Sequence, residues 1–293
     1  MKIIIGCANF GNHYGLKKKN LSVKKIINIM ALAKKLGIYH FDTAYDYKRS
    51  EDILGENIEK VFTNKKPLID TKIPKKLKFI NNVSNLKQIV LNTKKKLKIK
   101  KINTLYVHDT KQLLQKKGKK LYSELINLKK RKLIRNIGIS VYTIKETQKI
   151  IKKYKIDIIQ VPYNLIDNRF TNKNFLRLVK KKKCKLIARS IFLKGLLLKK
   201  PHKMNPYFKK WYKYFKNLNR KIKIENLSVK KLTLSRLNRE KTINSFIVGI
   251  SNTNQLREIS DILKNKKDKL LKEIDIPNIE DQNLINPRYW KLR

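Results

Sequence analysis

Short apolar runs with the composition of β-strands alternate with helix-like runs along almost the whole chain, at intervals of about 30 residues. The strand-like runs are expected at residues 2–6, 39–42, 68–73, 102–108, 134–139, 156–162, 185–190 and 245–250. Eight strands that are each followed by a helix are typical of a closed α/β barrel. The sequence therefore predicts the α/β class and a single (β/α)8 TIM barrel over residues 1–293.

An open, doubly wound sheet is the main alternative for such an alternation. Strands that are mostly apolar, such as residues 156–159 with Asp157 as the one polar residue, suit any parallel sheet that is covered by helices on its faces. An open sheet that binds a dinucleotide would carry a glycine fingerprint after its first strand. Gly6, Gly11 and Gly15 are present there, but their spacing does not fit that fingerprint. The closed barrel is the better prediction.

Two segments extend beyond the eight repeated units. Residues 201–223 form an insertion after the seventh strand, and residues 270–293 form a C-terminal tail. The insertion carries aromatic residues among lysines, and four of them share one helical face: Phe208, Trp211, Tyr212 and Phe215. An amphipathic helix packed on the barrel is the favoured interpretation. A lid over a substrate, or a surface that stacks on nucleic acid, remains an alternative.

The net charge of +52 could indicate a polyanionic partner. However, the basic residues are overwhelmingly Lys, they are spread over nearly all predicted helices, and Lys is enriched together with Ile and Asn. Specific recognition of phosphates and bases usually uses the planar fork of Arg. A biased composition explains the charge better, so we expect no specific nucleic-acid binding.

The sequence also limits the cellular environment and the kinds of site that can be expected for the protein. No apolar run approaches the ~20 residues that a membrane-spanning helix needs. The apolar run at residues 3–5 is too short for a secretory signal. Cys7 and Cys184 do not have the spacing of a metal site, and no phosphate-binding loop or nucleophile elbow is present. We expect a reduced, cytoplasmic setting, no membrane insertion and no metal.

Ionisable side chains follow three successive predicted strands. Asp42 ends the second strand with Tyr47 in the loop after it, Lys72 ends the third, and His108 ends the fourth. In a barrel, these strand ends open on one face, where active sites are built. Each residue alone is weak evidence, because a lysine at a strand end is usually solvated and a lone histidine is usually a core residue.

Together, these residues stand in recognisable motifs. The chain reads Phe41-Asp42-Thr43-Ala44-x-x-Tyr47, Ser50-Glu51-x-x-Leu54-Gly55, Thr71-Lys72 and Val107-His108, and it continues with Gly138-Ile139-Ser140, Gln160, Asn164, Ser190 and Gly249-x-Ser251-x-x-x-Gln255-Leu256-x-Glu258. In this order the motifs resemble the aldo-keto reductase superfamily. Three departures from the family pattern are Lys48 in place of Gly, Val141 in place of Asn and Ile259 in place of Asn.

The resemblance implies an NAD(P)-dependent reductase of aldehydes or ketones. Tyr47 would donate the proton, and Lys72 would lower the pKa of the Tyr47 phenol. Asp42 would hold Lys72 in place, and His108 would orient the carbonyl oxygen. A free phenol titrates near ~10, and a neighbouring ammonium lowers that pKa. Tyr45 is a less favoured alternative donor.

The resemblance also assigns a nicotinamide cofactor to the same face. Ser140 and Gln160 would hold the carboxamide, and Gly6 is a further expected contact. The pyrophosphate would be bordered by Ser190, Leu193 and Gly195, and the adenosine end by Gly249, Ser251, Gln255 and Glu258. Backbone N–H groups at a helix start give such an anion site its physical basis. NADP(H) is expected more than NAD(H).

The substrate is expected to be a small carbonyl compound. The loop at residues 9–15 and the ending at residues 286–290 resemble reductases of surface or spore-coat polysaccharide pathways, which suggests a sugar-derived carbonyl. One alternative is a sugar or sugar-nucleotide oxidoreductase in envelope polysaccharide synthesis. Another is a barrel that binds a cofactor and has a regulatory or polyanion-binding role.

Overall fold

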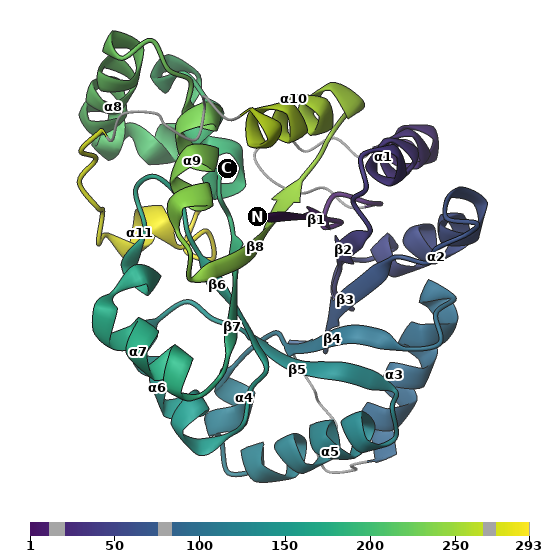
Figure 1. Ribbon diagram of the computed structural model, residues 1–293. Coiled ribbons are helices and arrows are strands. Elements are labelled where there is room, and N and C mark those ends of the chain that lie inside the picture. Colours follow the sequence, from purple (N-terminus) through teal and green to yellow (C-terminus); the bar gives the residue numbers. More distant parts are fainter. Residues whose placement is uncertain (12–20, 76–83, 266–273, 293) are drawn as a thin grey trace.

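A computed structural model of the chain shows a closed barrel of eight parallel strands (Figure 1), and it describes residues 1–11, 21–75, 84–265 and 274–292. The strands are β1 (Lys2–Gly6), β2 (His40–Asp42), β3 (Leu68–Lys72), β4 (Ile102–Val107), β5 (Ile134–Ser140), β6 (Ile158–Pro162), β7 (Lys185–Arg189) and β8 (Ile243–Gly249). Each strand pairs with the next in sequence, and β8 closes on β1. The predicted (β/α)8 TIM barrel is confirmed.

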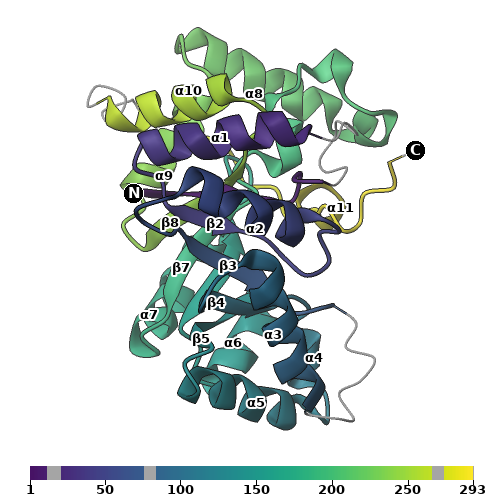
Figure 2. The ribbon, with the colours of Figure 1, turned by 90° about the vertical axis from the view of Figure 1, so that its right-hand side faces the viewer.

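Helices follow the strands and surround the barrel (Figures 1 and 2). They are α1 (Val23–Lys35), α2 (Ser50–Val61), α3 (Ser84–Leu97), α4 (Lys111–Leu114), α5 (Gly118–Lys130), α6 (Ile144–Lys153), α7 (Lys173–Lys181), α8 (Tyr212–Ile224), α9 (Val229–Arg239), α10 (Thr253–Lys264) and α11 (Gln282–Ile285). Side chains cap several of them. Ser22, Thr143 and Ser228, for example, each accept a hydrogen bond from a backbone N–H in the first turn.

The insertion after β7 contains an amphipathic helix, as its aromatic pattern predicts, and 3-10 turns precede this helix. It contains the 3-10 turns η3 (Pro201–Lys203) and η4 (Pro206–Trp211), which lead into α8, and the 3-10 segment η2 (Leu193–Leu198) precedes them. Proline has no N–H to donate within a helix, so the two prolines begin turns rather than extend a helix. Phe208 and Trp211 are buried as the pattern predicts.

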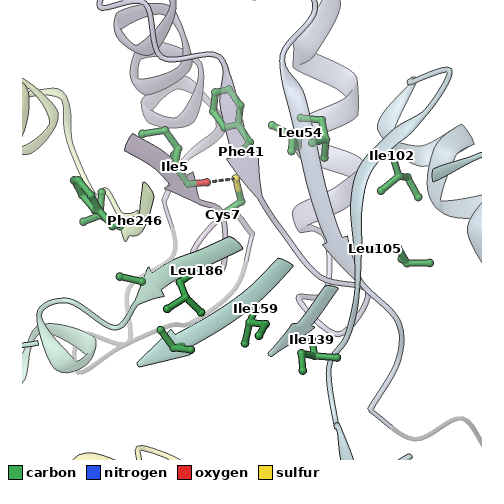
Figure 3. Close-up of a cluster of buried hydrophobic side chains, with 14 of the residues drawn as sticks. Ile5, Cys7, Phe41, Leu54, Ile102, Leu105, Ile139, Ile159, Leu186 and Phe246 are labelled. Atoms are coloured by element: carbon green, nitrogen blue, oxygen red, sulfur yellow. Dashed lines mark hydrogen bonds between the residues drawn. The ribbon is translucent and has the colours of Figure 1, made fainter. Parts of the chain in front are cut away.

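The main hydrophobic core lies between the outer face of the barrel and the helices. Part of this core is drawn in Figure 3, where Cys7 Sγ points at the carbonyl oxygen of Ile5, 3.6 Å away. Phe41 and Phe246 from other strands are fully buried in the same core. Each such side chain contributes roughly 1.5–3 kcal/mol when buried. Because side chains alternate along a strand, the residues between these core positions point into the barrel.

Inside the barrel, a small apolar layer closes the centre. It consists of Ile4, Tyr106, Ile158 and Ile187. Gly138 makes room for the Tyr106 ring, since a Cβ at this glycine would lie 2.4 Å from a ring carbon. The interior is therefore packed, and polar side chains toward the carboxyl ends of the strands face an open mouth.

A second hydrophobic cluster joins the insertion to the C-terminal tail. It includes Leu165, Phe208, Phe215 and Ile285. The rings of Phe208 and Trp290 meet edge to face with centroids 4.9 Å apart. The backbone N–H of Ile279 donates to the Ile166 carbonyl at 2.8 Å, and this bond ties the tail to the loop after β6. In Figure 1, α11 accordingly lies beside this part of the barrel.

A buried polar network also lies inside the barrel, two residues before the ends of β2 and β3. His40 Nε2 lies 2.9 Å from Asp70 Oδ2, and Asn103 Nδ2 donates to Asp70 Oδ1 at 2.7 Å. Burial alone would lower the pKa of His40, but the Asp70 carboxylate outweighs it and raises this pKa. The network therefore contains an ion pair whose strength depends on pH.

We predict that Asp70→Asn destabilises the protein more at pH 5.5 than at pH 8.5. The folded-state pKa of His40 is raised, so the ion pair contributes fully below the unfolded value of about 6.5 and is lost as the pH rises through the folded value. Removing one partner of a buried pair costs about 3 kcal/mol at the lower pH. Thermal unfolding at both pH values measures the effect.

Asp52→Asn is the matched control, because Asp52 forms a partly exposed ion pair with Lys96 at 3.7 Å on the helix surface. Its effect should stay below about 1 kcal/mol at either pH. Equal losses for Asp70→Asn at the two pH values would contradict the ion pair.

Candidate active site

A buried ion pair between β2 and β3 forms the centre of the candidate site. Lys72 Nζ lies 2.8 and 2.6 Å from the two carboxylate oxygens of Asp42, and it donates to the Thr43 carbonyl at 2.7 Å. The Lys72 side chain is only 3% exposed. Burial raises the pKa of Asp42 and Lys72 opposes this rise. The ammonium is thus held in one position by three oxygen atoms.

The loop that carries Tyr47 is braced from both sides. The Tyr47 backbone N–H donates to the Ala44 carbonyl at 3.0 Å. Ser50 Oγ donates to the Cys7 carbonyl at 2.8 Å, which ties the loop to the end of β1. Thr71 Oγ1 donates to Glu51 Oε1 at 2.6 Å and links the start of α2 to β3. The Ser50-Glu51 motif thus has a structural role that its use as a family marker did not reveal.

Lys48, which stands where the family has glycine, adopts the left-handed backbone conformation with φ of 48°. Glycine adopts this conformation without the steric penalty of a Cβ. The turn after Tyr47 is therefore retained, and the lysine bears its strain.

The four residues assigned to catalysis lie together at the mouth of the barrel. Lys72 Nζ is 5.3 Å from the Tyr47 ring centroid. The Tyr47 and His108 rings meet edge to face, with centroids 6.0 Å apart and an angle of 87° between their planes. Tyr47 is half-buried, whereas the alternative donor Tyr45 is 44% exposed. This geometry favours Tyr47 over Tyr45.

The pKa of Tyr47 is raised, so the expectation that Lys72 acidifies this phenol is not met in this structure. Burial is the main cause of the raised pKa, the negative charge of Asp42 adds to it, and Arg189 opposes it. The Lys72 ammonium donates to the Asp42 carboxylate and to the Thr43 carbonyl. Tyr47 therefore stays protonated at neutral pH.

His108 is neutral at physiological pH. Burial lowers its pKa to about 4, Asp46 opposes this shift, and the positive charges of Lys72 and Lys75 add to it. Its Nδ1 lies 3.4 Å from Asp46 Oδ2, but the orientation is not that of a hydrogen bond. A neutral imidazole carries one N–H donor, which suits the orientation of a carbonyl oxygen.

Gln160 belongs to the same network as the ion pair. Its Nε2 donates to Asp42 Oδ1 at 2.6 Å, a contact that the sequence analysis did not anticipate. Its Oε1 is buried and has no hydrogen-bond partner among the described residues. Ser140, which is also buried, lies beside Gln160 in the β5–β6 register. An unpaired buried acceptor here suits the amide N–H of a nicotinamide carboxamide.

Two glycines leave the neighbouring strand ends bare. Gly6 and Gly249 are partners in the β1–β8 register. A Cβ on Gly6 would lie 3.0 Å from Ile247 Cγ2. The absence of side chains at this seam allows a flat ligand to approach the backbone closely. The residues present therefore fit the nicotinamide cofactor that the resemblance implies.

The loop after β7 contains a run of left-handed residues. Ser190 has φ of 58°, and Leu193, Lys194 and Gly195 have φ of 47°, 52° and 89°. Left-handed conformations at residues other than glycine are strained, and such strain concentrates at functional sites. Leu193 is fully buried, so packing helps to hold the loop in this shape. The expected pyrophosphate contacts Ser190, Leu193 and Gly195 thus belong to one strained segment.

The residues expected at the adenosine end lie at the start of α10 and beyond it. The Ser251 backbone N–H donates to Gln255 Oε1 at 2.9 Å, and the Gln255 backbone N–H donates to Asn252 Oδ1 at 2.9 Å. Glu258 is instead paired with Lys230 of α9 at 2.5 Å. Ser251 and Gln255 are therefore close together, while Glu258 lies farther along the helix with its carboxylate engaged by α9.

Three residues at the mouth were missed as functional candidates from the sequence. Arg189 Cζ lies 4.1 Å from the Tyr142 ring centroid, and Arg288 Cζ lies 3.7 Å from the same centroid. Strand alternation could have revealed Arg189, because it lies two residues after Ile187, which faces the barrel interior. Arg288 lies far along the chain, in the tail, and only tertiary packing brings it here.

Part of one expected site element lies outside the described residues. The N-terminal loop at residues 9–15 is described only as far as residue 11, so His13 and Gly15 fall outside this part of the chain.

No described helix is both long enough and apolar enough to cross a membrane.

The fold and the buried Asp42–Lys72 pair beside Tyr47 and His108 define a barrel protein with a polar site at the carboxyl ends of its strands. Residues 2–278 match the model of the aldo/keto reductase family. This match covers nearly the whole chain, so the chain belongs to the aldo/keto reductase family and the resemblance is confirmed. The family consists of oxidoreductases that use nicotinamide cofactors.

Solved structures agree on the fold. An aldo-keto reductase from Bacillus halodurans in its holo form superposes with a TM-score of 0.74 at 17% identity, covering 92% of this chain and 90% of that one. A glycerol dehydrogenase from Gluconobacter oxydans gives a TM-score of 0.66 at 17% identity, with 94% of both chains covered. At such low sequence identity, the similarity shows the shared fold alone. No curated protein matches the sequence.

We predict that Lys48→Gly changes the free energy of unfolding by less than about 1 kcal/mol, because relief of backbone strain offsets the greater freedom of the unfolded chain. Lys48→Val should lower it by roughly 1–2 kcal/mol, because a β-branched residue tolerates the left-handed conformation poorly. Chemical denaturation of both variants measures the difference. A Val variant as stable as the Gly variant would show that this turn is not left-handed.

Proposed function

We propose that this protein reduces an aldehyde or ketone with NAD(P)H and, in reverse, oxidises the alcohol. The observation that carries the proposal is the Lys72 ammonium, held by Asp42 and lying 5.3 Å from the Tyr47 ring, with His108 edge to face on that ring. Membership of the aldo/keto reductase family supports the same chemistry.

In this proposal, each of the four side chains has a separate task. The bound cofactor supplies a hydride to the carbonyl carbon. Tyr47 gives its phenolic proton to the carbonyl oxygen, so the product is a neutral alcohol. Lys72 stabilises the negative charge that is left on Tyr47, and Asp42 keeps Lys72 in position. Neutral His108 donates a hydrogen bond to the carbonyl oxygen and orients it.

The raised pKa of Tyr47 is compatible with this role. A phenol that remains protonated is ready to donate, but it is a weak acid until charge develops on the substrate oxygen. The fixed ammonium of Lys72 and the N–H of His108 then stabilise charges that exist only as the reaction proceeds. Such preorganised groups contribute more to the rate than to substrate binding.

For the cofactor, we propose that Gln160 and Ser140 hold the carboxamide, in keeping with the unpaired Gln160 Oε1. The other expected contacts are Gly6, Ser190, Leu193, Gly195, Gly249, Ser251, Gln255 and Glu258. NADP(H) is proposed over NAD(H). An open groove of about 510 Å³ runs along α10, and its lining includes both basic residues (Lys231 and Arg257) and acidic residues (Glu258 and Asp261).

The finer proposals concern the substrate and the setting. A sugar-derived carbonyl, of the kind used in envelope polysaccharide synthesis, is the narrower candidate, because the tail segment that resembles such reductases brings Arg288 to the mouth. A cytoplasmic setting agrees with two cysteines that are not joined to each other, Cys7 and Cys184. Initial rates with sugar aldehydes and simple aldehydes, each with NADPH and NADH, test both substrate class and cofactor preference.

We predict that Tyr47→Phe lowers kcat/KM for carbonyl reduction by at least roughly 100-fold, because it removes the proton donor. Binding of NADPH, followed by quenching of protein fluorescence, should be unchanged. Tyr45→Phe is the matched control, since it removes a phenol hydroxyl from the same loop at an exposed position. Full activity of Tyr47→Phe, or a comparable loss for Tyr45→Phe, would refute the assignment.

The pH profile of reduction provides a separate prediction. His108 is neutral above its pKa of about 4, and the pKa of Tyr47 is raised above its ordinary value. Log kcat/KM should therefore be flat from about pH 5.5 to pH 9, where neither group changes its charge. A limb with its midpoint near the ordinary imidazole value of about 6.5 would contradict the buried, neutral state of His108.

A further inference from the structure

Two guanidinium groups meet on one tyrosine at the mouth of the barrel. Arg189, the last residue of β7, lies with Cζ 4.1 Å from the Tyr142 ring centroid, and Arg288 from the tail lies 3.7 Å from it. The two guanidinium carbons are therefore no farther apart than the sum of these distances. Lys194 and Lys75 lie close enough to act on the same phenol. We name Arg189, Arg288, Lys194 and Lys75 the basic cluster.

Neutral oxygens accept the hydrogen bonds of both guanidiniums. Arg189 donates to the Val141 carbonyl at 2.7 Å and to Ser190 Oγ at 3.4 Å, and Arg288 donates to Asn286 Oδ1 at 3.4 Å. Neither arginine forms an ion pair with a carboxylate within the described ranges, although Arg189 is close enough to Asp167 to act on its pKa. Arg189 Nε is buried and also lacks a partner there. A buried donor without an acceptor is unusual and indicates a missing ligand.

The carboxylates around the mouth already have other partners. Asp42 is engaged by Lys72, and Asp167 makes a bidentate pair with Arg169 at 2.8 and 2.7 Å. Asp46 accepts from the Lys75 backbone N–H at 3.0 Å and lies beside His108. The mouth therefore has an excess of positive charge.

The titration of the neighbouring groups is consistent with this excess. Burial alone would raise the pKa of Tyr142, but Arg189, Arg288, Lys194 and Lys75 together outweigh it and lower this pKa. The pKa of Lys194 is lowered by burial and, further, by the nearby positive charges of Arg189 and Lys75. Bringing these cations together is unfavourable unless an anion joins them.

The position of the basic cluster favours the substrate over the cofactor as the source of that anion. Lys75 and Tyr142 follow β3 and β5, the strands that also supply Lys72 and Ser140. Arg189 precedes, and Lys194 belongs to, the segment at residues 190–195 that is expected to border the cofactor pyrophosphate, whereas Lys75 and Arg288 come from other parts of the chain. Arg189 and Tyr142 are both close enough to Tyr47 to affect its pKa. An anion in the basic cluster would thus lie near a carbonyl group held at Tyr47.

We propose that the basic cluster binds a carboxylate or phosphate carried by the carbonyl substrate, so that the enzyme selects anionic carbonyl compounds. This inference rests on the proposed reductase function. The planar forks of Arg189 and Arg288 suit the paired oxygens of either group. The composition of the chain strengthens the argument, because two of its few arginines converge on one tyrosine in a protein whose basic residues are mostly lysine.

The experiment compares kcat/KM for matched anionic and neutral substrates with saturating NADPH at constant ionic strength near 150 mM. D-glucuronate is paired with D-glucose, and D-glyceraldehyde 3-phosphate with D-glyceraldehyde, which separates a carboxylate from a phosphate. The wild type should prefer at least one anionic member by roughly 10- to 100-fold. Arg189→Gln and Arg288→Gln should each remove most of that preference, measured as the ratio of kcat/KM for the anionic member to kcat/KM for the neutral member.

Arg220→Gln on the exposed face of α8 is the matched control, because it removes the same charge outside the basic cluster. It should keep the wild-type preference, which separates local binding from general electrostatic attraction. Equal rates of the wild type on both members of both pairs would overturn the proposal. So would a preference that survives in Arg189→Gln and Arg288→Gln.

Two further measurements separate this inference from the proposed function. NADPH binding should be unchanged in Arg288→Gln, and a loss of NADPH affinity in place of the lost preference would assign the cluster to the cofactor and overturn the proposal. Calorimetric titration with gluconate and glycerol 3-phosphate in the presence of NADPH needs no turnover. Binding that is lost in Arg288→Gln would support the anion site even if no carbonyl were reduced, and no binding by the wild type would reject it.

Discussion

The buried ion pair of Asp42 and Lys72 is the interaction on which the site depends. An ammonium inside a barrel is costly unless oxygen atoms surround it, and here two carboxylate oxygens and the Thr43 carbonyl do so. The same carboxylate accepts the amide of Gln160 from β6. One carboxylate therefore links three strands and sets where Lys72 and the Gln160 amide lie. The packed apolar layer around Tyr106 and Ile158 closes the barrel centre beside them.

The loops at the mouth are held by different means from the strands. Ser50 and Glu51 tie the Tyr47 loop to β1 and β3, so the phenol lies at a defined place beside the ion pair. Left-handed residues shape the turn at Lys48 and the segment from Leu193 to Gly195. Strain of this kind costs about 1–3 kcal/mol per residue and persists where surrounding contacts over-determine the backbone. The mouth thus combines a rigid base with strained loops that shape its rim.

Much of the fold could be predicted from the sequence because the strands are apolar, short and regularly spaced. Each predicted strand overlaps an observed one, and the boundaries differ by at most two residues, as for β8, which begins at Ile243 rather than at residue 245. The aromatic spacing of the insertion predicts an amphipathic helix, and α8 is such a helix with Phe215 buried. Pro201 and Pro206 begin 3-10 turns before it, because proline has no N–H to donate within a helix.

The grouping of Asp42, Tyr47, Lys72 and His108 could be predicted because parallel strands bring their carboxyl ends to one face. The protonation behaviour of these side chains could not be predicted in the same way. The pKa of Tyr47 depends on its burial and on the surrounding charges of Asp42 and Arg189, and neither is encoded in local spacing. Arg288 joins the site through the packing of Phe208 against Trp290. Such a contact between the insertion and the tail leaves no periodic signal in the sequence.

The most direct measurement of the central claim is a double-mutant cycle on kcat/KM with Tyr47→Phe, Lys72→Met and the combined variant. If Lys72 acts by stabilising the charge left on Tyr47, its substitution has little further effect once the phenol hydroxyl is gone, so the combined variant should be about as slow as the slower single variant. Multiplicative losses would show that Lys72 and Tyr47 act independently, and the account would then be wrong.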